Sequence, residues 1–104
     1  MKTDQFIQLV AQEKASAILR TNSQEKAAKA MEAAIRGGFK LVEFTLTVPG
    51  VFELIQDFSR REGIVVGAGT VLTPEDAKRS VDAGAQFLVS PVVGEAVIRS
   101  AIEM

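Results

Sequence analysis

The chain contains no cysteine and no histidine in its 104 residues. The missing cysteines exclude disulfides and thiol chemistry, and the missing histidines exclude a Ser-His-Asp triad. A zinc site would have to be built from carboxylates alone, which is an unusual ligand set. Any chemistry must therefore come from carboxylate, lysine, hydroxyl and backbone groups.

An excess of one charge and a long apolar run are also missing. The formal net charge is −1, from 12 basic and 13 acidic residues, and the basic residues are scattered. This distribution argues against a nucleic-acid partner. No apolar run approaches the roughly 20 residues that span a membrane, and the polar N-terminus lacks the apolar segment of a signal peptide. We therefore expect one domain, residues 1–104, in the cytoplasm, binding neither nucleic acid nor membrane.

Helix-like and strand-like segments alternate along the sequence. Apolar residues at a helical period, with caps at Asn22 or Ser23 and at Thr73, predict helices. These helices are expected at 3–13, from 22 or 23 to Gly37, at 51–61, 73–84 and 94–102. Apolar, β-branched segments predict strands at 15–20, 40–47, 64–70 and 86–90. One helix followed by four strand–helix units is typical of a parallel sheet with helices outside it.

Glu43 is a carboxylate in the middle of the apolar segment 40–47. Its neighbours on both sides are apolar, which predicts a strand that is buried on both faces. A carboxylate buried there without a partner would cost about several kcal/mol. We therefore expect Glu43 to lie at a solvated strand end and to face a molecule on which it acts. A structural ion pair, with Arg20 as the partner, is the alternative interpretation.

Ligands of parallel α/β folds bind beyond the carboxyl ends of the strands. The residues predicted at that edge are Arg20, Thr21, Glu43, Thr45, Thr47, Gly69, Thr70, Ser90 and Pro91. A base, an acid and several hydroxyls together suit an anionic, oxygen-rich substrate, with proton transfer by Glu43. A period of two would put Glu43, Thr45 and Thr47 on one face. Arg20 also fits a surface or ion-pair role, and the threonines also fit as ordinary strand residues.

The segment Gly67-Ala68-Gly69-Thr70 superficially resembles a phosphate-binding loop. It lacks the third glycine of a dinucleotide fingerprint, and the chain has no Gly-Lys-Ser/Thr sequence of a nucleotide hydrolase. We expect its small residues to let packed side chains or a ligand approach the strand closely.

Four segments together resemble the 2-keto-3-deoxy-6-phosphogluconate (KDPG) and 4-hydroxy-2-oxoglutarate (KHG) aldolases. They are residues 18–23, 41–49, 66–71 and 83–91, in order and with matching spacing over nearly the whole chain. The resemblance implies a (β/α)₈ barrel and class I aldolase chemistry. In that chemistry a lysine forms a Schiff base with a 2-keto acid, pyruvate and an aldehyde are released, and no cofactor or metal is needed.

The same resemblance implies roles for individual residues. Glu43 matches the general acid/base, and Arg20 matches a position that helps to bind the substrate carboxylate or the network at the rim. Thr70 matches a residue that contacts the pyruvate carboxylate, and Pro91 lines the pocket. Thr47 stands where some members carry an arginine, which bears on substrate preference.

The chain departs from the family at the nucleophile. The family's Schiff-base lysine lies on the sixth strand, and none of the lysines here matches it: Lys2, Lys14, Lys26, Lys29, Lys40 and Lys78. A (β/α)₈ barrel needs roughly 200 residues, so the predicted fold is a (βα)₄ half of a TIM barrel with an N-terminal helix. An open flavodoxin-like parallel sheet is the alternative.

The expected function follows from this departure. We expect a truncated chain of the aldolase lineage that binds a pyruvate-type 2-keto acid, is inactive alone, and forms a homo-oligomer through its exposed sheet edges. The alternative is a non-catalytic half-barrel fragment or assembly module. A metal-dependent aldolase would need ligands that the chain can supply only as carboxylates.

Overall fold

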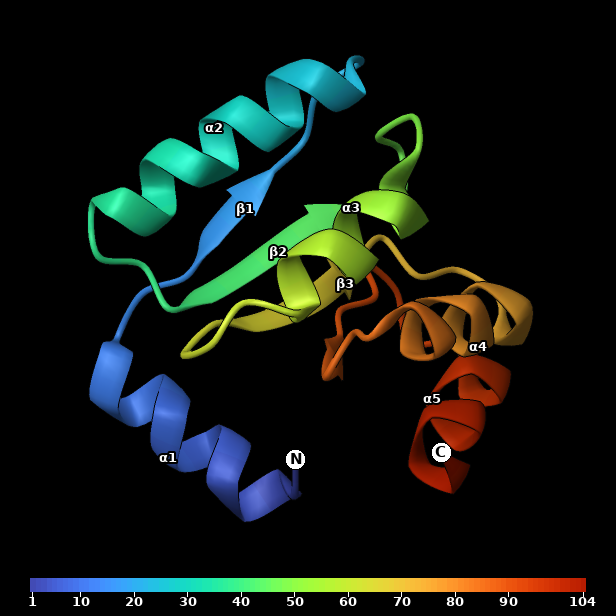
Figure 1. Ribbon diagram of the computed structural model, residues 1–104. Coiled ribbons are helices and arrows are strands. Elements are labelled where there is room, and N and C mark those ends of the chain that lie inside the picture. Colours follow the sequence, from blue (N-terminus) through green and yellow to red (C-terminus); the bar gives the residue numbers. More distant parts are fainter.

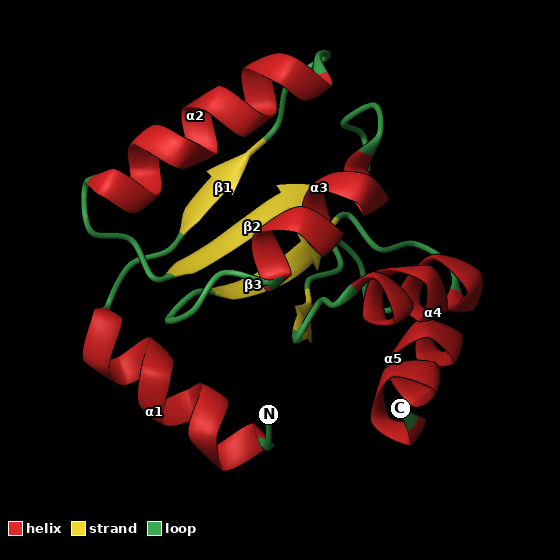
Figure 2. Ribbon diagram, viewed as in Figure 1, coloured by secondary structure: helices red, strands yellow, loops and turns green.

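The computed structural model describes residues 1–104 and contains five helices and four strands in alternation. Figures 1 and 2 show this arrangement. The elements are α1 (Thr3–Glu13), β1 (Ala17–Leu19), α2 (Gln24–Arg36), β2 (Leu41–Thr45), α3 (Val51–Ser59), β3 (Val65–Gly69), α4 (Pro74–Ala83), β4 (Phe87–Leu88) and α5 (Glu95–Glu103). The order of elements is the predicted one. None of the helices combines the length and the apolar character that crossing a bilayer requires.

The four strands form one parallel sheet in the order β1-β2-β3-β4. Consecutive order is the order in which the strands of a (β/α)₈ barrel follow one another. A flavodoxin-like sheet would instead place the second strand outside the first, in the order 2-1-3. The half-barrel prediction is therefore confirmed, and the flavodoxin-like alternative is wrong.

The register divides the strand residues between two faces. Ile18 pairs with Glu43, Glu43 with Gly67, and Gly67 with Phe87, so these four residues share one face. We call it the inner face. The opposite, outer face carries the apolar core residues Val42, Phe44, Val66 and Ala68. The core lies between this outer face and the helices α2 to α5.

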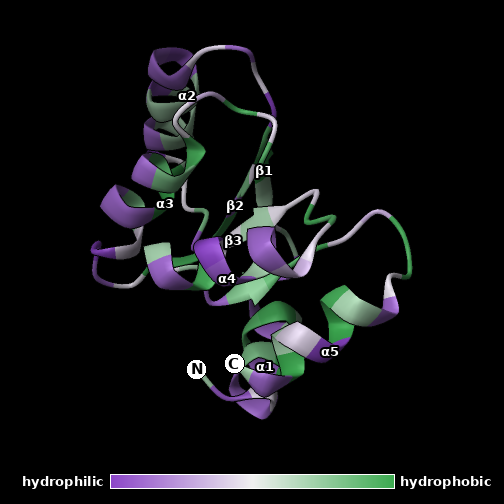
Figure 3. Cartoon of the chain, turned by 90° about the vertical axis from the view of Figure 1, so that its right-hand side faces the viewer, coloured by the Kyte–Doolittle hydropathy of each residue, from purple (hydrophilic) through white to green (hydrophobic).

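The helices bury apolar stripes against the outer face of the sheet. Buried residues come from α2 (Ala27, Met31), α3 (Val51, Leu54, Ile55, Phe58), α4 (Ala77) and α5 (Val97). In Figure 3 the strands are mainly hydrophobic, whereas α2 carries hydrophilic residues along its length. Helix α1 lies apart from the others, near the end of the sheet where the strands begin (Figure 1). The helices thus leave the opposite, carboxyl ends of the strands free for a site.

The helix caps show which local signals were correct. The Thr73 hydroxyl accepts a hydrogen bond from the Asp76 amide at 3.0 Å, as its place before Pro74 predicts. Ser23 rather than Asn22 caps α2, and its hydroxyl accepts from the Lys26 amide at 3.2 Å.

Several elements are shorter than predicted. β1 has three residues and β4 has two, whereas five or more residues are predicted for each. Both are edge strands of this sheet, each paired with one neighbour. Helix α3 ends at Ser59, two residues before the predicted end.

Candidate functional site

Glu43 is on the inner face of β2 and is only 5% exposed. The four ion pairs of the structure are Glu25–Lys29, Glu32–Arg61, Asp82–Lys78 and Glu95–Arg99, and none involves Glu43. The expected alternative, a structural ion pair with Arg20, is therefore wrong. No fully buried side-chain oxygen or nitrogen lacks a hydrogen-bond partner. Glu43 makes no hydrogen bond, so its carboxyl oxygens keep only a narrow contact with solvent. The expected place at a solvated strand end is wrong, because Glu43 is the central residue of the buried strand β2.

The surroundings of Glu43 change its acidity. Burial raises the pKa of the Glu43 carboxyl above its ordinary value of 4.5, and the positive charge of Arg20 lowers it by a smaller amount. The net direction is upward, so the protonated form persists at higher pH than for a solvated glutamate. A carboxyl of this kind can both donate and accept a proton closer to neutral pH.

The two glycines of β3 make room for the inner-face side chains. A Cβ built on Gly69 would overlap the Oε2 atom of Glu43 and lie 3.0 Å from its Cδ. A Cβ built on Gly67 would overlap the ring of Phe87. This confirms that the small residues of this segment allow close approach. Gly69 in particular lets the carboxylate lie against the backbone of β3.

Arg20 and Thr70 form a bridge across the carboxyl end of the sheet. Arg20 follows β1 and Thr70 follows β3, and the Arg20 Nη2 donates a hydrogen bond to the Thr70 hydroxyl at 3.0 Å. β2 lies between these two strands, so the bridge lies beside the strand that carries Glu43. Thr70 has a φ of 60°, a left-handed conformation that is unusual for a β-branched residue. Such strain is common at functional sites, and the sequence carries no signal for it.

Thr47 is placed differently from its prediction. β2 ends at Thr45, so the alternation of a strand does not extend to Thr47, which is exposed in the following turn. The turn nevertheless brings the two hydroxyls together, with 2.8 Å between Thr45 Oγ1 and Thr47 Oγ1. Thr45 also donates to the Leu19 carbonyl at 3.5 Å and so connects β2 to β1.

Pro91 lies exposed on the loop after β4. The hydroxyl of the preceding residue, Ser90, donates a hydrogen bond to the Val92 carbonyl at 2.9 Å. Among the predicted site residues, the structure thus brings together Arg20 with Thr70 around the strand of Glu43, and Thr45 with Thr47. Pro91 has no hydrogen bond to any of them.

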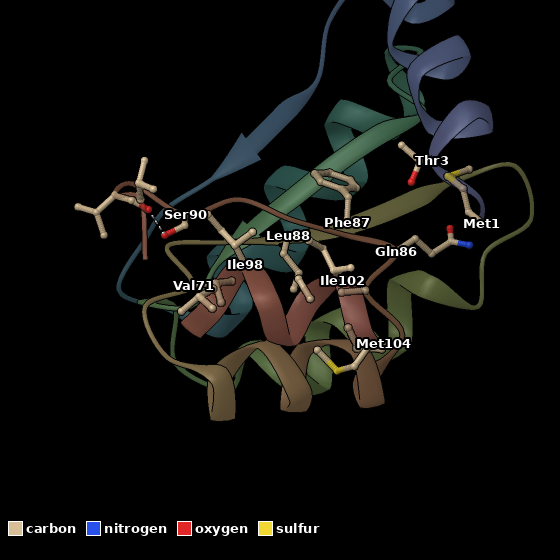
Figure 4. Close-up of a pocket in the computed structure, with 16 residues that line it drawn as sticks. Met1, Thr3, Val71, Gln86, Phe87, Leu88, Ser90, Ile98, Ile102 and Met104 are labelled. Carbon is tan, nitrogen blue, oxygen red and sulfur yellow. Dashed lines mark hydrogen bonds between the residues drawn. The ribbon is translucent and has the colours of Figure 1, made fainter. Parts of the chain in front are cut away.

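A separate cavity lies elsewhere in the structure. It is a groove of about 780 Å³ along β4, α5 and the N-terminus, and 13 of its 16 lining residues are hydrophobic. In Figure 4, Leu88 lies beside Ile98 and Ile102, and Phe87 lies on the side of Thr3 and Met1. None of Arg20, Glu43, Thr47, Thr70 and Pro91 lines this groove. We therefore assign the polar site to the Glu43 region and treat the groove as a separate, apolar feature. No group of three or more Asp or Glu side chains is placed to hold a metal ion.

The consecutive parallel sheet, with helices on its outer face and polar groups beyond its strands, places the chain in the class of β/α-barrel proteins. The particular family follows from the comparison of sequences. The chain belongs to the KDPG and KHG aldolase family, whose model matches residues 7–104.

Individual relatives agree with this assignment. A probable 2-dehydro-3-deoxy-6-phosphogalactonate aldolase from Rhizobium meliloti (strain 1021) is 40% identical over 87 residues, covering 82% of this chain and 41% of the relative. The crystal structure of the 2-keto-3-deoxy-6-phosphogluconate aldolase of Zymomonas mobilis ZM4 with 3-phosphoglycerate superposes with a TM-score of 0.75 at 32% identity. That match covers 85% of this chain and 42% of the other. A 4-hydroxy-2-oxoglutarate/2-dehydro-3-deoxyphosphogluconate aldolase from TTHB1 gives a TM-score of 0.77 at 29% identity. That match covers 93% of this chain and 48% of the other. The chain thus spans less than half the length of these relatives.

Proposed function

We propose that this chain carries the acid/base and carboxylate-binding part of a KDPG/KHG-type aldolase site. It is a single domain of the class I aldolase lineage that binds a 2-keto acid such as pyruvate and acts in the cytoplasm as a homo-oligomer. Glu43 moves protons, and Arg20 and Thr70 bind the carboxylate. Thr47 and Pro91 contact the remainder of the substrate. The observation that carries the proposal is Glu43 itself, a nearly buried carboxylate with no protein partner and a raised pKa.

The geometry suits a small carboxylic acid. One Arg20 nitrogen is held by Thr70, and the remaining guanidinium donors are free to form the paired hydrogen bonds that carboxylates accept. The protonated Glu43 can give its proton to the substrate's carbonyl oxygen, and the ionised form can take a proton back. Glu43 needs no other residue for this exchange because its carboxyl reaches solvent.

The lysines are placed away from this site. Lys26 and Lys29 are exposed on α2, Lys78 is exposed on α4, and Lys40 precedes β2 at the opposite end of the sheet from Thr70. Lys29 and Lys78 are also held in ion pairs with Glu25 and Asp82. The chain therefore supplies binding and proton transfer, and we expect no imine with the substrate.

Pyruvate titration followed by NMR chemical shifts tests the binding. Arg20→Ala should weaken binding about 10- to 100-fold, because a hydrogen bond to a charged group contributes about 1.5–3 kcal/mol. Arg99→Ala is the matched control, since Arg99 lies on the exposed surface of α5, and it should bind like the unaltered chain. Shifts that are scattered over the surface, or that survive Arg20→Ala unchanged, would contradict the assignment.

Borohydride reduction in the presence of pyruvate tests the chemistry separately. The expected intact mass is that of the unmodified chain, whereas a full-length relative with its lysine should gain the mass of a reduced pyruvate adduct. A single modified lysine would show a nucleophile that the positions of the six lysines do not predict.

A second candidate function, a non-catalytic assembly module, is favoured by a different observation. Large apolar side chains are exposed beside the free sheet edges, including Ile102, which is 79% exposed, and Val93, which is 92% exposed. An assembly module would associate through these residues without binding pyruvate. The titration with pyruvate separates the two candidates.

A further inference from the structure

Two loops lie next to each other beyond the carboxyl ends of β1 and β2. Residues 20–23 connect β1 to α2, and residues 46–50 connect β2 to α3. The first loop begins with Arg20 and the second contains Thr47, which the proposed function assigns to different parts of one substrate. Figure 1 shows the two loops side by side beyond the arrowheads of the strands.

Two side-chain hydrogen bonds connect these loops. At the strand ends, Thr45 Oγ1 donates to the Leu19 carbonyl at 3.5 Å. At the helix starts, Gln24 Nε2 donates to the Gly50 carbonyl at 3.1 Å. Both bonds join residues that are 26 positions apart, so the two loops run in step and are connected at both ends. The bond at the strand ends is long, and the Gln24 bond is therefore the stronger of the two.

Gly50 leaves room for the Gln24 amide. It has a φ of 66°, a left-handed conformation that glycine adopts without strain. A Cβ built on Gly50 would overlap the side-chain amide of Gln24, which thus occupies the space of the missing side chain. The Gly50 carbonyl also accepts a backbone hydrogen bond from the Leu54 amide of α3 at 3.2 Å. Gln24 therefore binds the point at which the second loop passes into α3.

The second loop carries Thr47 on its exposed side. Val48 is buried in the core, whereas Thr47 is exposed, and its hydroxyl lies 2.8 Å from Thr45 Oγ1. Arg20 is bound by Thr70 and has no hydrogen bond to this loop. The hydrogen bonds at the two ends of the loops are therefore what sets the separation between Arg20 and Thr47.

We propose that Gln24 is a positioning residue that sets the spacing between Arg20 and Thr47 and so selects 2-keto acids with a polar group beyond C3. The proposal rests on the proposed function, in which Arg20 and Thr70 bind the carboxylate and Thr47 contacts the remainder. Gln24 itself does not contact the substrate. Pyruvate ends at C3 and needs only the Arg20–Thr70 pair. A longer 2-keto acid gains affinity from Thr47 only while the second loop is held in place.

Titrations of the 104-residue chain with two ligands, followed by NMR chemical shifts, test the selectivity. The ligands are pyruvate and 4-hydroxy-2-oxoglutarate, which carries a hydroxyl at C4 and a second carboxylate. Gln24→Ala should leave the dissociation constant of pyruvate unchanged. It should raise that of 4-hydroxy-2-oxoglutarate about 3- to 10-fold, the factor that one hydrogen bond typically contributes. Gln24→Glu keeps the shape but removes the amide donor, and it should shift the ratio of the two constants in the same direction.

Mobility of the second loop, measured by ¹⁵N relaxation without ligand, tests the positioning directly. Gln24→Ala and Gln24→Glu should each lower the order parameter of the Thr47 amide and leave that of Glu43 in β2 unchanged. Gln56→Ala is the matched control, because Gln56 is an exposed glutamine on α3 whose side chain makes no hydrogen bond. It should change neither the mobility nor the two dissociation constants.

The outcomes separate this proposal from the proposed function. An unchanged Thr47 order parameter in both Gln24 variants would overturn the positioning role. Equal weakening of both ligands would overturn the selectivity, because a merely structural role lowers both affinities together. If the unaltered chain binds pyruvate but binds 4-hydroxy-2-oxoglutarate no more tightly, the selectivity fails and the proposed function stands. If the unaltered chain binds neither ligand, both fail.

Discussion

Replacing Gly69 with alanine should lower the pKa of Glu43, while the free energy of unfolding should change only slightly. The added Cβ would overlap Oε2 of Glu43 and crowd its Cδ at 3.0 Å. Gly69 has no positive φ, so alanine is compatible with its backbone. The overlap involves the far end of a flexible side chain, which can turn toward the open inner face. Glu43 should therefore become more solvated, and its pKa should fall toward 4.5, because burial is the main cause of the present increase.

The stability change follows from two opposing contributions. Forcing extra volume into a rigid core costs about 1–3 kcal/mol, but a rotamer change limits the cost to about 0.5–1.5 kcal/mol. Exchanging glycine for alanine at a compatible position stabilises by about 0.4–1 kcal/mol through the unfolded chain. The net change in the free energy of unfolding should thus stay within about 1 kcal/mol, which is about 4–8 °C in melting temperature for a domain of this size.

The assay is a pH titration of the Glu43 carboxyl carbon by NMR, with urea unfolding measured on the same samples. Gly67→Ala is the matched control, because its Cβ meets the ring of Phe87 and not Glu43. It should disturb packing while leaving the pKa of Glu43 raised. In a Glu43→Ala background, Gly69→Ala should become stabilising, since nothing is left to clash. An unchanged Glu43 pKa in Gly69→Ala would refute the reasoning.

Three further substitutions have defined expectations. Phe44→Ala should lower the free energy of unfolding, measured in urea, by about 3–5 kcal/mol. The Phe44 ring is fully buried, and its centroid lies 5.2 Å from that of Phe58. A loss below about 1 kcal/mol would contradict its place in the core. Thr73→Ala should lower the free energy of unfolding by about 1 kcal/mol, because the N-cap hydrogen bond of α4 is lost. Thermal unfolding measures this loss, and Thr3→Ala, which removes no cap, is the control. Glu43→Gln should stabilise the fold at pH 7 and lose this advantage below pH 4.5, which unfolding across that pH range measures.

The arrangement of the elements was predictable from sequence because each signal is local. The apolar stripe of α2, the Thr73-Pro74 start of α4 and the buried pattern of β2 all depend on residues within a few positions. The strand ends were less predictable, because pairing depends on the neighbour. Ala15, Ser16 and Arg20 have strand-compatible neighbours in sequence, but only Ala17 to Leu19 pair with β2.

The candidate site also has a part that the sequence predicts and a part that it does not. Glu43 could be found because a charge in an otherwise apolar strand is a local anomaly. The Arg20–Thr70 hydrogen bond joins residues 50 positions apart, and the left-handed φ of Thr70 results from how β3 leaves the sheet. Neither has a signature in the neighbouring sequence. Resemblance to a family suggested both residues as substrate contacts, but it did not suggest that they bind each other.

The energetics of Glu43 argue that its position serves function. Its folded-state pKa is raised above 4.5, so the folded chain holds the proton more tightly than the unfolded chain does. The resulting stabilisation is present below pH 4.5 and is lost as the pH rises through the folded-state pKa. At neutral pH the nearly buried carboxylate therefore opposes folding, and the positive charge of Arg20 offsets this cost only in part. Glutamine has nearly the same shape and would avoid that cost. Glu43 and the glycine that accommodates it thus bring the fold no stability, which supports the proton-transfer role that we propose for Glu43.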